Sequence, residues 1–154
     1  MFGKRKYLGD YISKKGNSKE TIIERNVRGD SILSNMRAIL QDIPLGNRRT
    51  QTGLIFRQAW FINGCFFNSE IWTGVNDNDM KYLTIIDHKI LRLITGAQAK
   101  VPSEMLFLET SQIPIKNIIA LRRILYLQNI LLRQEDELVR RVYCAMKSSP
   151  LKGD

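Results

Sequence analysis

The residue types best suited to chemistry gather near the N-terminus, where cationic side chains surround two tyrosines. These residues are Lys4, Arg5, Lys6, Lys14 and Lys15, with Tyr7 and Tyr11 between them. Cations can neutralise phosphate groups while aromatic faces stack on sugars or bases. The group therefore predicts binding of a polyanion such as nucleic acid. The alternative is a solvated basic segment that serves only solubility.

A second cationic group precedes a predicted helix. Arg48 and Arg49 lead directly into Thr50 and Thr52. At a helix N-terminus, free backbone N–H groups and the helix dipole would add to the guanidinium charges in binding a phosphate. Arg57, in the apolar helix expected to follow, completes the predicted nucleic-acid contacts. The plainer alternative is that one threonine caps the helix and both arginines are solvated.

The net charge favours the same class of partner. The 154 residues contain 24 Lys plus Arg against 15 Asp plus Glu, a formal net charge of +9. Residues 1–60 contain 12 basic and 5 acidic side chains, whereas residues 61–154 contain 12 and 10. We therefore expect a polyanion to meet the N-terminal third first. The arginines at 122–123 and 140–141 fall inside predicted helices, where at least one of each pair is expected to pack over the core or pair with an acid.

Residues for catalysis or metal binding are scarce. His88 is the only histidine, which excludes paired-histidine and histidine-rich metal sites. Cys65 and Cys144 have no Cys-x-x-Cys spacing and are expected to be small core residues in a reducing compartment. Asp77 and Asp79 precede a helix, so capping is favoured over cation binding. The chain has no phosphate-binding Gly-x-x-x-x-Gly-Lys motif and no Gly-x-Ser-x-Gly motif.

The elements that must position these residues are expected to be mainly helical. Aromatic and β-branched residues over 6–13 predict a short strand pair, or a strand and turn. From Asn17 onward, apolar residues recur at helical spacing and predict a helix over 18–41. Gly29 lies in the middle of that helix and predicts a kink or a close contact with another helix.

Further helices are expected over residues 54–72, from 76–78 to 96, over 103–109, over 114–132 and from 135 onward. The first of these is apolar almost all round, which predicts a buried helix. The second has one apolar stripe, with Asp87 near the stripe and His88 directed away from it. The chain is thus predicted to be a bundle of five to six helices preceded by a short N-terminal β-hairpin or strand.

Composition and length fit one ordinary globular domain, since 44% of the residues are apolar and 25% are charged. We divide the chain into a strand and turn over 1–16, a helical domain over 17–147 and a tail over 148–154. No apolar stretch reaches the roughly 18 residues of a membrane-spanning helix, and the N-terminus lacks a signal-peptide pattern. We therefore expect a soluble intracellular protein of the cytoplasm or nucleus, with no membrane partner.

Several short motifs follow one another in a set order along the chain. They are Lys6-Tyr7-Leu8-Gly9 with Ile12-Ser13, Asn68-Ser69-Glu70-Ile71-Trp72, Ile86-Asp87-His88 with Leu91-Arg92, Pro102-Ser103-Glu104-Met105-Leu106-Phe107-Leu108-Glu109, Ile113-Pro114-Ile115, Arg122-Arg123 with Tyr126-Leu127, and the terminal Pro150-Leu151-Lys152-Gly153-Asp154. Their order resembles the region that follows the polymerase active site in reverse transcriptases of non-LTR retrotransposons. Together they cover nearly the whole chain.

The resemblance implies a place and a partner for the basic N-terminus. In that family the Tyr-Leu-Gly motif closes the palm near the primer strand, and the following helices form the thumb that holds the template–primer duplex. It therefore assigns Tyr7, Leu8 and Gly9 to a primer-grip-like hairpin at the end of the palm and residues 17–147 to a thumb-like domain. The implied partners are an RNA–DNA or DNA duplex and the rest of the polymerase, its fingers and palm.

The sequence departs from that family where catalysis is concerned. The family's aromatic-x-Asp-Asp motif holds divalent cations, Mg²⁺ in the parent enzymes, for RNA-directed DNA polymerisation, and this chain contains no Asp-Asp pair. Two-metal catalysis needs ligands for both ions. We therefore expect no catalytic residue, no metal site and no cofactor in this chain, and no polymerase activity from it alone.

Two other interpretations remain open from the sequence. The chain could be a helical protein-interaction or scaffold module whose positive charge is incidental, and a large exposed apolar patch would indicate this. It could also be a decayed retroelement fragment without selected activity. Neither interpretation requires the cations to converge on one surface.

Overall fold

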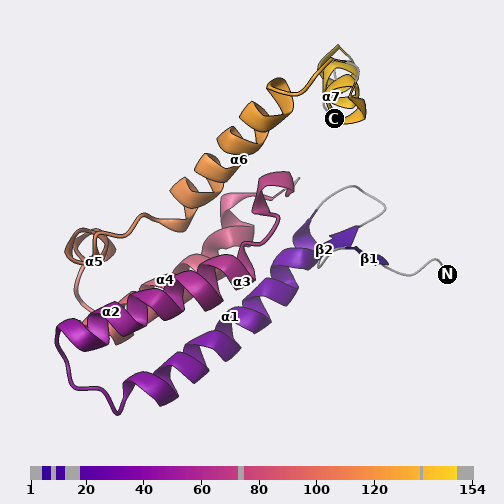
Figure 1. The fold of residues 1–154 in the computed structure, drawn as a ribbon. Coiled ribbons are helices and arrows are strands. Elements are labelled where there is room, and N and C mark those ends of the chain that lie inside the picture. The colour runs from indigo at the N-terminus through magenta and orange to yellow at the C-terminus, as the bar shows by residue number, and fades with distance from the viewer. Residues whose placement is uncertain (1–4, 8–9, 13–17, 73–74, 136, 149–154) are drawn as a thin grey trace.

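A computed structural model describes residues 5–7, 10–12, 18–72, 75–135 and 137–148. In the strands, only the side chain of Asp10 is described. Of the predicted contacts, Lys4, Leu8, Gly9, Lys14 and Lys15 therefore lie outside the described residues, as does the tail from 149. The fold is mainly helical, as the sequence predicts (Figure 1).

A short antiparallel hairpin precedes the helices. Strand β1 (Arg5–Tyr7) pairs with β2 (Asp10–Ile12), and the register places Lys6 opposite Tyr11 and Arg5 opposite Ile12. The predicted N-terminal hairpin is thus confirmed at the level of the backbone.

The helices follow in chain order. They are α1 (Lys19–Leu40), α2 (Asn47–Phe56) continued by the π-helical turn η1 (Arg57–Ile62) and by α3 (Asn63–Cys65), the 3-10 turn η2 (Ser69–Ile71), α4 (Asp77–Thr95), α5 (Ser103–Thr110), α6 (Ile115–Leu131) and α7 (Leu138–Ser148). When the continuous run from α2 to α3 is counted once, the described residues contain six helices, which is within the predicted range.

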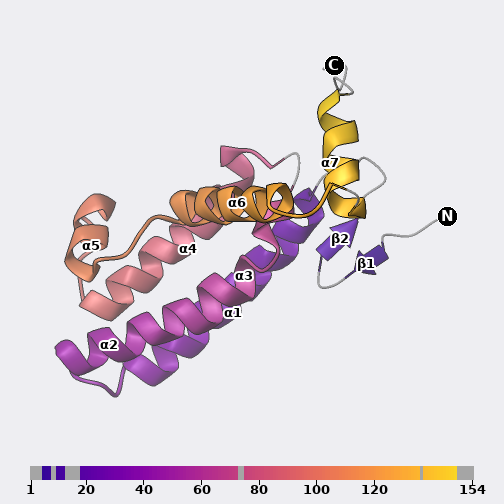
Figure 2. The same cartoon turned by 45° about the horizontal axis from the view of Figure 1, so that its top comes forward.

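Three helical runs form the body of the molecule. Helices α1 and α4 run in the same direction, and the run α2–η1–α3 lies antiparallel to both (Figures 1 and 2). Their facing sides bury the core, which includes Met36, Leu40, Phe61, Leu83 and Ile90. The apolar residues of α1 and α4 recur every three to four positions, so each helix presents one stripe to this core.

Gly29 permits the close approach of α1 and α4. A Cβ atom at this position would lie 2.9 Å from Cδ1 of Ile86. The predicted close helix contact is therefore confirmed. Gly53 performs the same function in α2, where a Cβ atom would lie 2.5 Å from Cγ1 of Ile94.

The prediction of a buried helix over 54–72 is wrong in two respects. The helical run begins at Asn47 and ends at Cys65. Its outer side is also exposed, with Ile55 65% and Trp60 37% accessible. The physical reason is that α1 and α4 cover only one side of this run, so an apolar residue on the other side stays in solvent. Trp60 shields itself partly by stacking on Phe56, with ring centroids 4.5 Å apart.

Helix α4 has the boundaries that its sequence predicts. The side chain of Asn76 accepts a hydrogen bond from the backbone N–H of Asp79, and the Asp79 side chain accepts one from the Asn76 N–H, which is a capping box. Gly96 ends the helix in the left-handed conformation with φ 73°. The capping role is thus confirmed for Asp79, whereas the exposed carboxylate of Asp77 pairs with Lys116.

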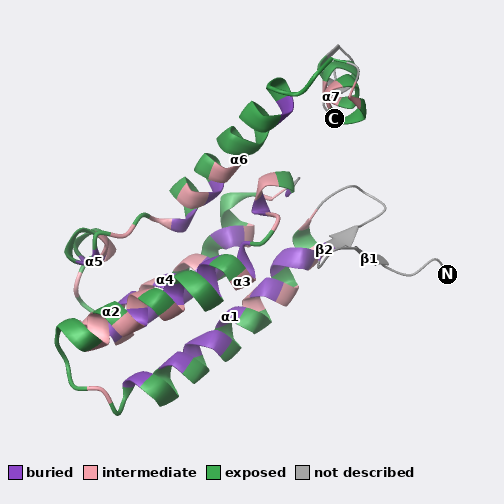
Figure 3. Cartoon of the chain, viewed as in Figure 1, coloured by how far each residue is buried: buried purple, intermediate pink, exposed green. Residues whose placement is uncertain are grey.

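Helix α6 extends away from the three-helix body and carries α7 at its far end (Figures 1 and 2). Helix α6 packs against η2, where Arg122 reaches Ser69, and α7 packs against α6. Much of α6 and α7 is consequently exposed (Figure 3). None of the described helices combines the length and the apolar character that a membrane crossing requires.

Candidate nucleic-acid interface

A buried ion pair docks the hairpin onto the helical body. The Arg25 Nη2 atom of α1 donates to Oδ1 of Asp10 at 3.0 Å, and the two side chains are 5% and 13% exposed. Arg25 Nη1 also donates to the carbonyl oxygen of Gly64 in α3 at 3.3 Å. One guanidinium group therefore joins β2, α1 and α3.

Sequence reasoning did not single out Asp10 or Arg25. A signal for Arg25 is present, because it falls on the same helical face as Ile22, Gly29 and Ile32, all of which are buried. An arginine on an apolar stripe needs an anionic or carbonyl partner inside the fold. The identity of that partner could not be read from helical spacing, since Asp10 lies in a strand.

The Asp10–Arg25 pair also affects the charge of the hairpin segment. Asp10 is the only acidic residue in residues 1–17, which contain five lysines and arginines. Its carboxylate is directed at α1 and neutralised there. The segment contains no second acidic residue, so no other carboxylate within it offsets the charges of its five lysines and arginines.

Arg28 is an exposed cation beside the Asp10–Arg25 ion pair. It lies one helical turn after Arg25, and its guanidinium group lies against Gly64, within 3.3 Å of the position a Cβ atom would take. The nearby Cys65 is buried, which raises its thiol pKa to about 11, and the charges of Arg28 and Arg25 partly oppose this rise. Arg28 was not among the predicted contacts.

Arg48 and Arg49, which the sequence places in one cationic group, have different surroundings in the structure. Arg48 is exposed at the start of α2. Arg49 instead donates to the carbonyl oxygen of Leu93 through Nε and Nη2, at 3.3 and 2.9 Å, and to that of Ile43 through Nη1 at 2.9 Å. Three of its N–H groups are therefore engaged with backbone carbonyl groups, which leaves Arg49 less available to a phosphate than Arg48 is.

The cap predicted for this helix is also wrong. Gly46 is the N-cap of α2, with no side-chain cap, so Thr50 and Thr52 lie inside the helix. The glycine has φ 145°, a conformation that a residue with a Cβ atom rarely adopts. The helix consequently begins earlier than the threonines.

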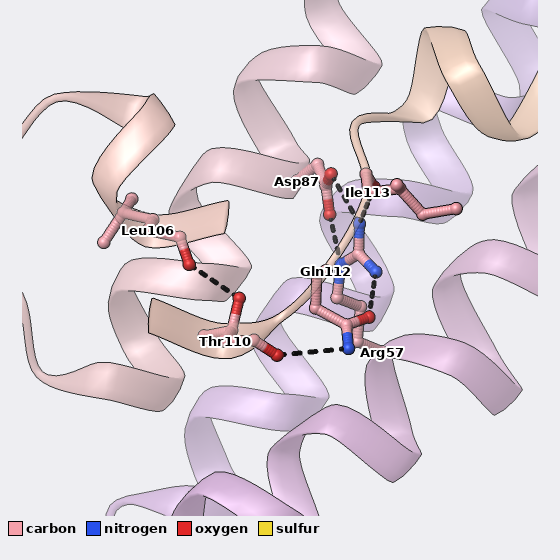
Figure 4. Close-up of polar contacts among 6 residues, drawn as sticks. All are labelled: Arg57, Asp87, Leu106, Thr110, Gln112 and Ile113. Carbon is pink, nitrogen blue, oxygen red and sulfur yellow. Dashed lines mark hydrogen bonds and ion pairs between the residues drawn. The ribbon is translucent and has the colours of Figure 1, made fainter. Parts of the chain in front are cut away.

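Arg57 is a further correction to the predicted contacts. Its side chain is 1% exposed and forms two hydrogen bonds with the carboxylate of Asp87, at 2.7 and 2.8 Å (Figure 4). It also donates to Oε1 of Gln112 at 2.8 Å and to the carbonyl oxygen of Ile113 at 3.4 Å. A guanidinium group enclosed in this way does not face solvent, so Arg57 is removed from the interface.

Several other arginines donate to backbone carbonyl groups where the chain changes direction. Arg92 donates to Val101, Arg122 to Phe66, Arg123 to Trp72, and Arg140 to Leu131 and Arg133. The expectation for the pairs at 122–123 and 140–141 was contact with the core or with an acid. Arg140 also pairs with Glu135, while the main partners of Arg122 and Arg123 are carbonyl oxygens.

The single histidine has a structural setting. Nδ1 of His88 lies 3.1 Å from Oγ of Ser103, and its ring packs edge-on against Phe107. Burial lowers the pKa of His88 below 6.5, assisted by Arg92 and opposed by Asp87 and Glu104. His88 is thus partly buried and not fully solvated, whereas Asp87 lies on the buried stripe as predicted.

The described residues contain no group of three or more His, Cys, Asp or Glu side chains placed to hold a metal ion. Cys65 is buried as predicted, but Cys144 is exposed, because α7 packs on α6 and not in the core. Comparisons of the chain with protein-family models, curated proteins and solved structures find no match.

Proposed function

We propose that this chain is a thumb-like nucleic-acid-binding fragment of a retroelement reverse transcriptase. It grips a template–primer duplex, RNA–DNA or DNA, through the phosphate backbone and supplies no catalytic group. Its contact surface is centred on the basic segment, residues 4–15. The resemblance of the motif order to non-LTR reverse transcriptases motivates the choice of duplex.

The observation that supports this proposal most is the Asp10–Arg25 ion pair. A strand pair of this size is not stable in isolation in water, so its cations would act as a flexible basic tail. The ion pair instead fixes β2 against α1 and directs the single acid of the segment inward. A docked cationic hairpin can bind a phosphate backbone with less loss of conformational entropy than a free tail.

The contact set now differs from the one predicted by the sequence. Arg57 is left out because it is buried against Asp87, and Arg49 is given less weight because it donates to backbone carbonyl groups. Arg28 is added because it is exposed beside the Asp10–Arg25 ion pair. Arg48 is exposed near the start of α2, at the end of the three-helix body that lies away from the hairpin (Figure 1). It contacts the duplex only if the duplex extends along that body. Binding through the backbone predicts little preference for sequence.

The first test is the salt dependence of duplex binding, measured by fluorescence anisotropy with a labelled 20-bp DNA and an RNA–DNA hybrid. Neutralising about five phosphates gives a slope of roughly −4 to −5 in log K against log salt on B-form DNA. A slope near zero would refute the proposal.

A pair of matched variants separates the effect of the basic segment, residues 4–15, from the effect of the overall charge. Lys14→Gln with Lys15→Gln removes two charges from the basic segment, and Lys81→Gln with Lys89→Gln removes two from the exposed side of α4. We expect the first variant to lose about two units of slope and to bind all sequences more weakly. Equal losses in both variants would indicate that only net charge matters.

The substitution Asp10→Asn tests whether the Asp10–Arg25 ion pair, by fixing the hairpin against α1, strengthens duplex binding. This substitution raises the net charge by one, so simple attraction predicts tighter binding. We expect weaker binding, because the contact between residue 10 and Arg25 loses its ionic character and holds the hairpin less firmly on α1. Tighter binding by a variant that remains folded would contradict the proposed role of the dock.

A further inference from the structure

A cleft of about 380 Å³ lies between α6 and the segment from α3 to η2. This volume is within the range of small-molecule sites in proteins. Helix α6 forms one wall with Arg122, Tyr126 and Asn129, which are separated by three or four positions and therefore share one helix face. The opposite wall comes from α3, η2 and the turn between them.

The polar side chains of the cleft include both hydrogen-bond acceptors and donors. Glu70 of η2 is half-buried, and among the described residues its carboxylate has no hydrogen-bond or ion-pair partner. Arg122 is also half-buried, and its Nη1 atom donates to the carbonyl oxygen of Phe66. The exposed amides of Asn63 and Asn129 line the same cleft, and each amide both donates and accepts.

Each wall of the cleft also contributes an aromatic ring. Phe67, from the wall between α3 and η2, is 53% exposed, and Tyr126 of α6 is 40% exposed. Ring surface therefore remains available on both sides of the cleft. Such surface binds flat aromatic ligands by stacking, and stacking on a nucleobase does not depend on which base is present.

The chemistry of the lining residues selects the class of ligand. A phosphate group would be repelled by the unpaired carboxylate of Glu70, and an ammonium group would be repelled by Arg122. A hydrocarbon would leave these charged side chains and the amides of the cleft desolvated without partners. A nucleobase satisfies all three conditions, because it is flat, uncharged and carries donors and acceptors along its edge.

We propose that this cleft binds an unpaired nucleobase of the nucleic acid held by the basic segment, residues 4–15. Asn63 of the cleft directly precedes Gly64, whose carbonyl oxygen accepts a hydrogen bond from Arg25 at 3.3 Å. Arg28 lies against the same glycine. The cleft thus adjoins the ion pair that fixes the hairpin. The inference deepens the proposed function and rests on it for the source of the base.

The first test compares two 20-bp DNA duplexes that differ in one base. One contains a single bulged nucleotide, and the other contains a bulged abasic sugar in its place, so the two have the same backbone and charge. We expect the chain to bind the duplex with the base about fivefold or more tightly, measured by fluorescence anisotropy. Equal affinities would overturn the inference.

Two pairs of alanine substitutions locate the contact. Phe67→Ala with Tyr126→Ala should abolish the difference between the base and the abasic duplex and leave binding of a fully paired duplex unchanged. The matched control, Ile71→Ala with Leu127→Ala, alters two residues of similar exposure, 50% and 38%, beside the cleft. The control should keep the difference. Its loss in both pairs would contradict binding in the cleft.

The substitution Glu70→Ala separates base recognition from simple attraction. Removal of a negative charge should, by attraction alone, strengthen binding to both bulged duplexes equally. We expect the ratio of the two affinities to fall by about tenfold instead, because a hydrogen bond from the base to the carboxylate is lost. An unchanged ratio would overturn the assigned role of Glu70.

Free nucleosides test the cleft without any duplex. At about 10 mM, where millimolar binding is populated, nucleosides should shift the ring resonances of Tyr126 in NMR spectra of the full chain, and Phe67→Ala should reduce the shifts. Absence of any shift would overturn the inference. If nucleosides shift these resonances but a fully paired duplex does not bind, the proposed function fails while the base-binding cleft stands.

Discussion

Arg57 and Asp87 form a two-bond ion pair in the interior, with Nε donating to Oδ1 at 2.7 Å and Nη2 donating to Oδ2 at 2.8 Å. Each side chain is 1% exposed. Burial raises the pKa of the Asp87 carboxyl, and the adjacent guanidinium opposes that rise. Through Gln112 and Ile113 the pair also holds the link between α5 and α6 (Figure 4).

Removing one partner of this pair should be strongly destabilising. Asp87→Leu leaves a buried, unpaired guanidinium group, and we expect a loss of about 3–5 kcal/mol in the free energy of unfolding, measured by urea denaturation. Arg57→Met combined with Asp87→Leu should cost much less than the two single changes added together, because no charge remains buried. Additive losses would show that the two side chains are not coupled.

The two glycines at helix contacts should respond differently to alanine. Ala gains about 1 kcal/mol over Gly from helix propensity. At Gly29 the new Cβ meets only the end of the Ile86 side chain below 3.0 Å, so we expect almost no net change. At Gly53 it meets Ile94 at 2.5 Å near the branch point, and overpacking of about 1–3 kcal/mol should dominate. Thermal unfolding of the two variants should show that Gly53→Ala lowers the melting temperature more than Gly29→Ala does. Equal decreases in the melting temperature would contradict this prediction.

His88 should give a measurable pH dependence of stability. Its pKa in the folded chain lies below 6.5, so the unfolded chain binds the proton first as the pH falls. The free energy of unfolding should therefore decrease as the pH drops from about 6.5 through the folded-state pKa. His88→Gln should remove this component, which is obtained by subtracting urea melts of the two proteins between pH 5 and 7.5. If the free energy of unfolding changed with pH equally in the wild type and in His88→Gln, a contribution from His88 would be ruled out.

The two cysteines should differ in reactivity. Cys144 is exposed, whereas Cys65 is buried with a thiol pKa of about 11 and contacts the carbonyl oxygen of Arg25. Because the thiolate is the reactive form, a thiol reagent at pH 8 should label one cysteine in the native chain and two in urea. Cys144→Ser should abolish native labelling, and rapid labelling of this variant would show that Cys65 is accessible.

Local chemistry made several elements predictable from the sequence. The capping box at Asn76 and Asp79 and the left-handed Gly96 depend on residues within one helical turn of each other. At Gly29 the sequence left two alternatives, a kink or a close helix contact, because glycine weakens a long helix, and the structure shows the close contact. Helix boundaries and apolar stripes are set over such short distances, which is why they can be read directly.

Long-range partners were decided by the tertiary structure. Charge counting placed Arg49 and Arg57 in a nucleic-acid interface, yet the fold gives one to backbone carbonyl groups and the other to Asp87. Arg25 escaped notice because its acid, Asp10, lies in a strand. A cation's sequence neighbours do not reveal which distant oxygen atoms the packed helices bring to it.

The tertiary structure also decided which apolar residues and cysteines are exposed to solvent. The pattern of residues 54–72 predicts a buried helix and that of α7 predicts a buried Cys144, but Ile55 and Cys144 both face solvent. By itself, the sequence determined which residues share a helix face and that the chain is strongly basic. Only the tertiary structure decided which faces are covered and which cations stay free, because burial depends on neighbouring elements that helical periodicity does not identify.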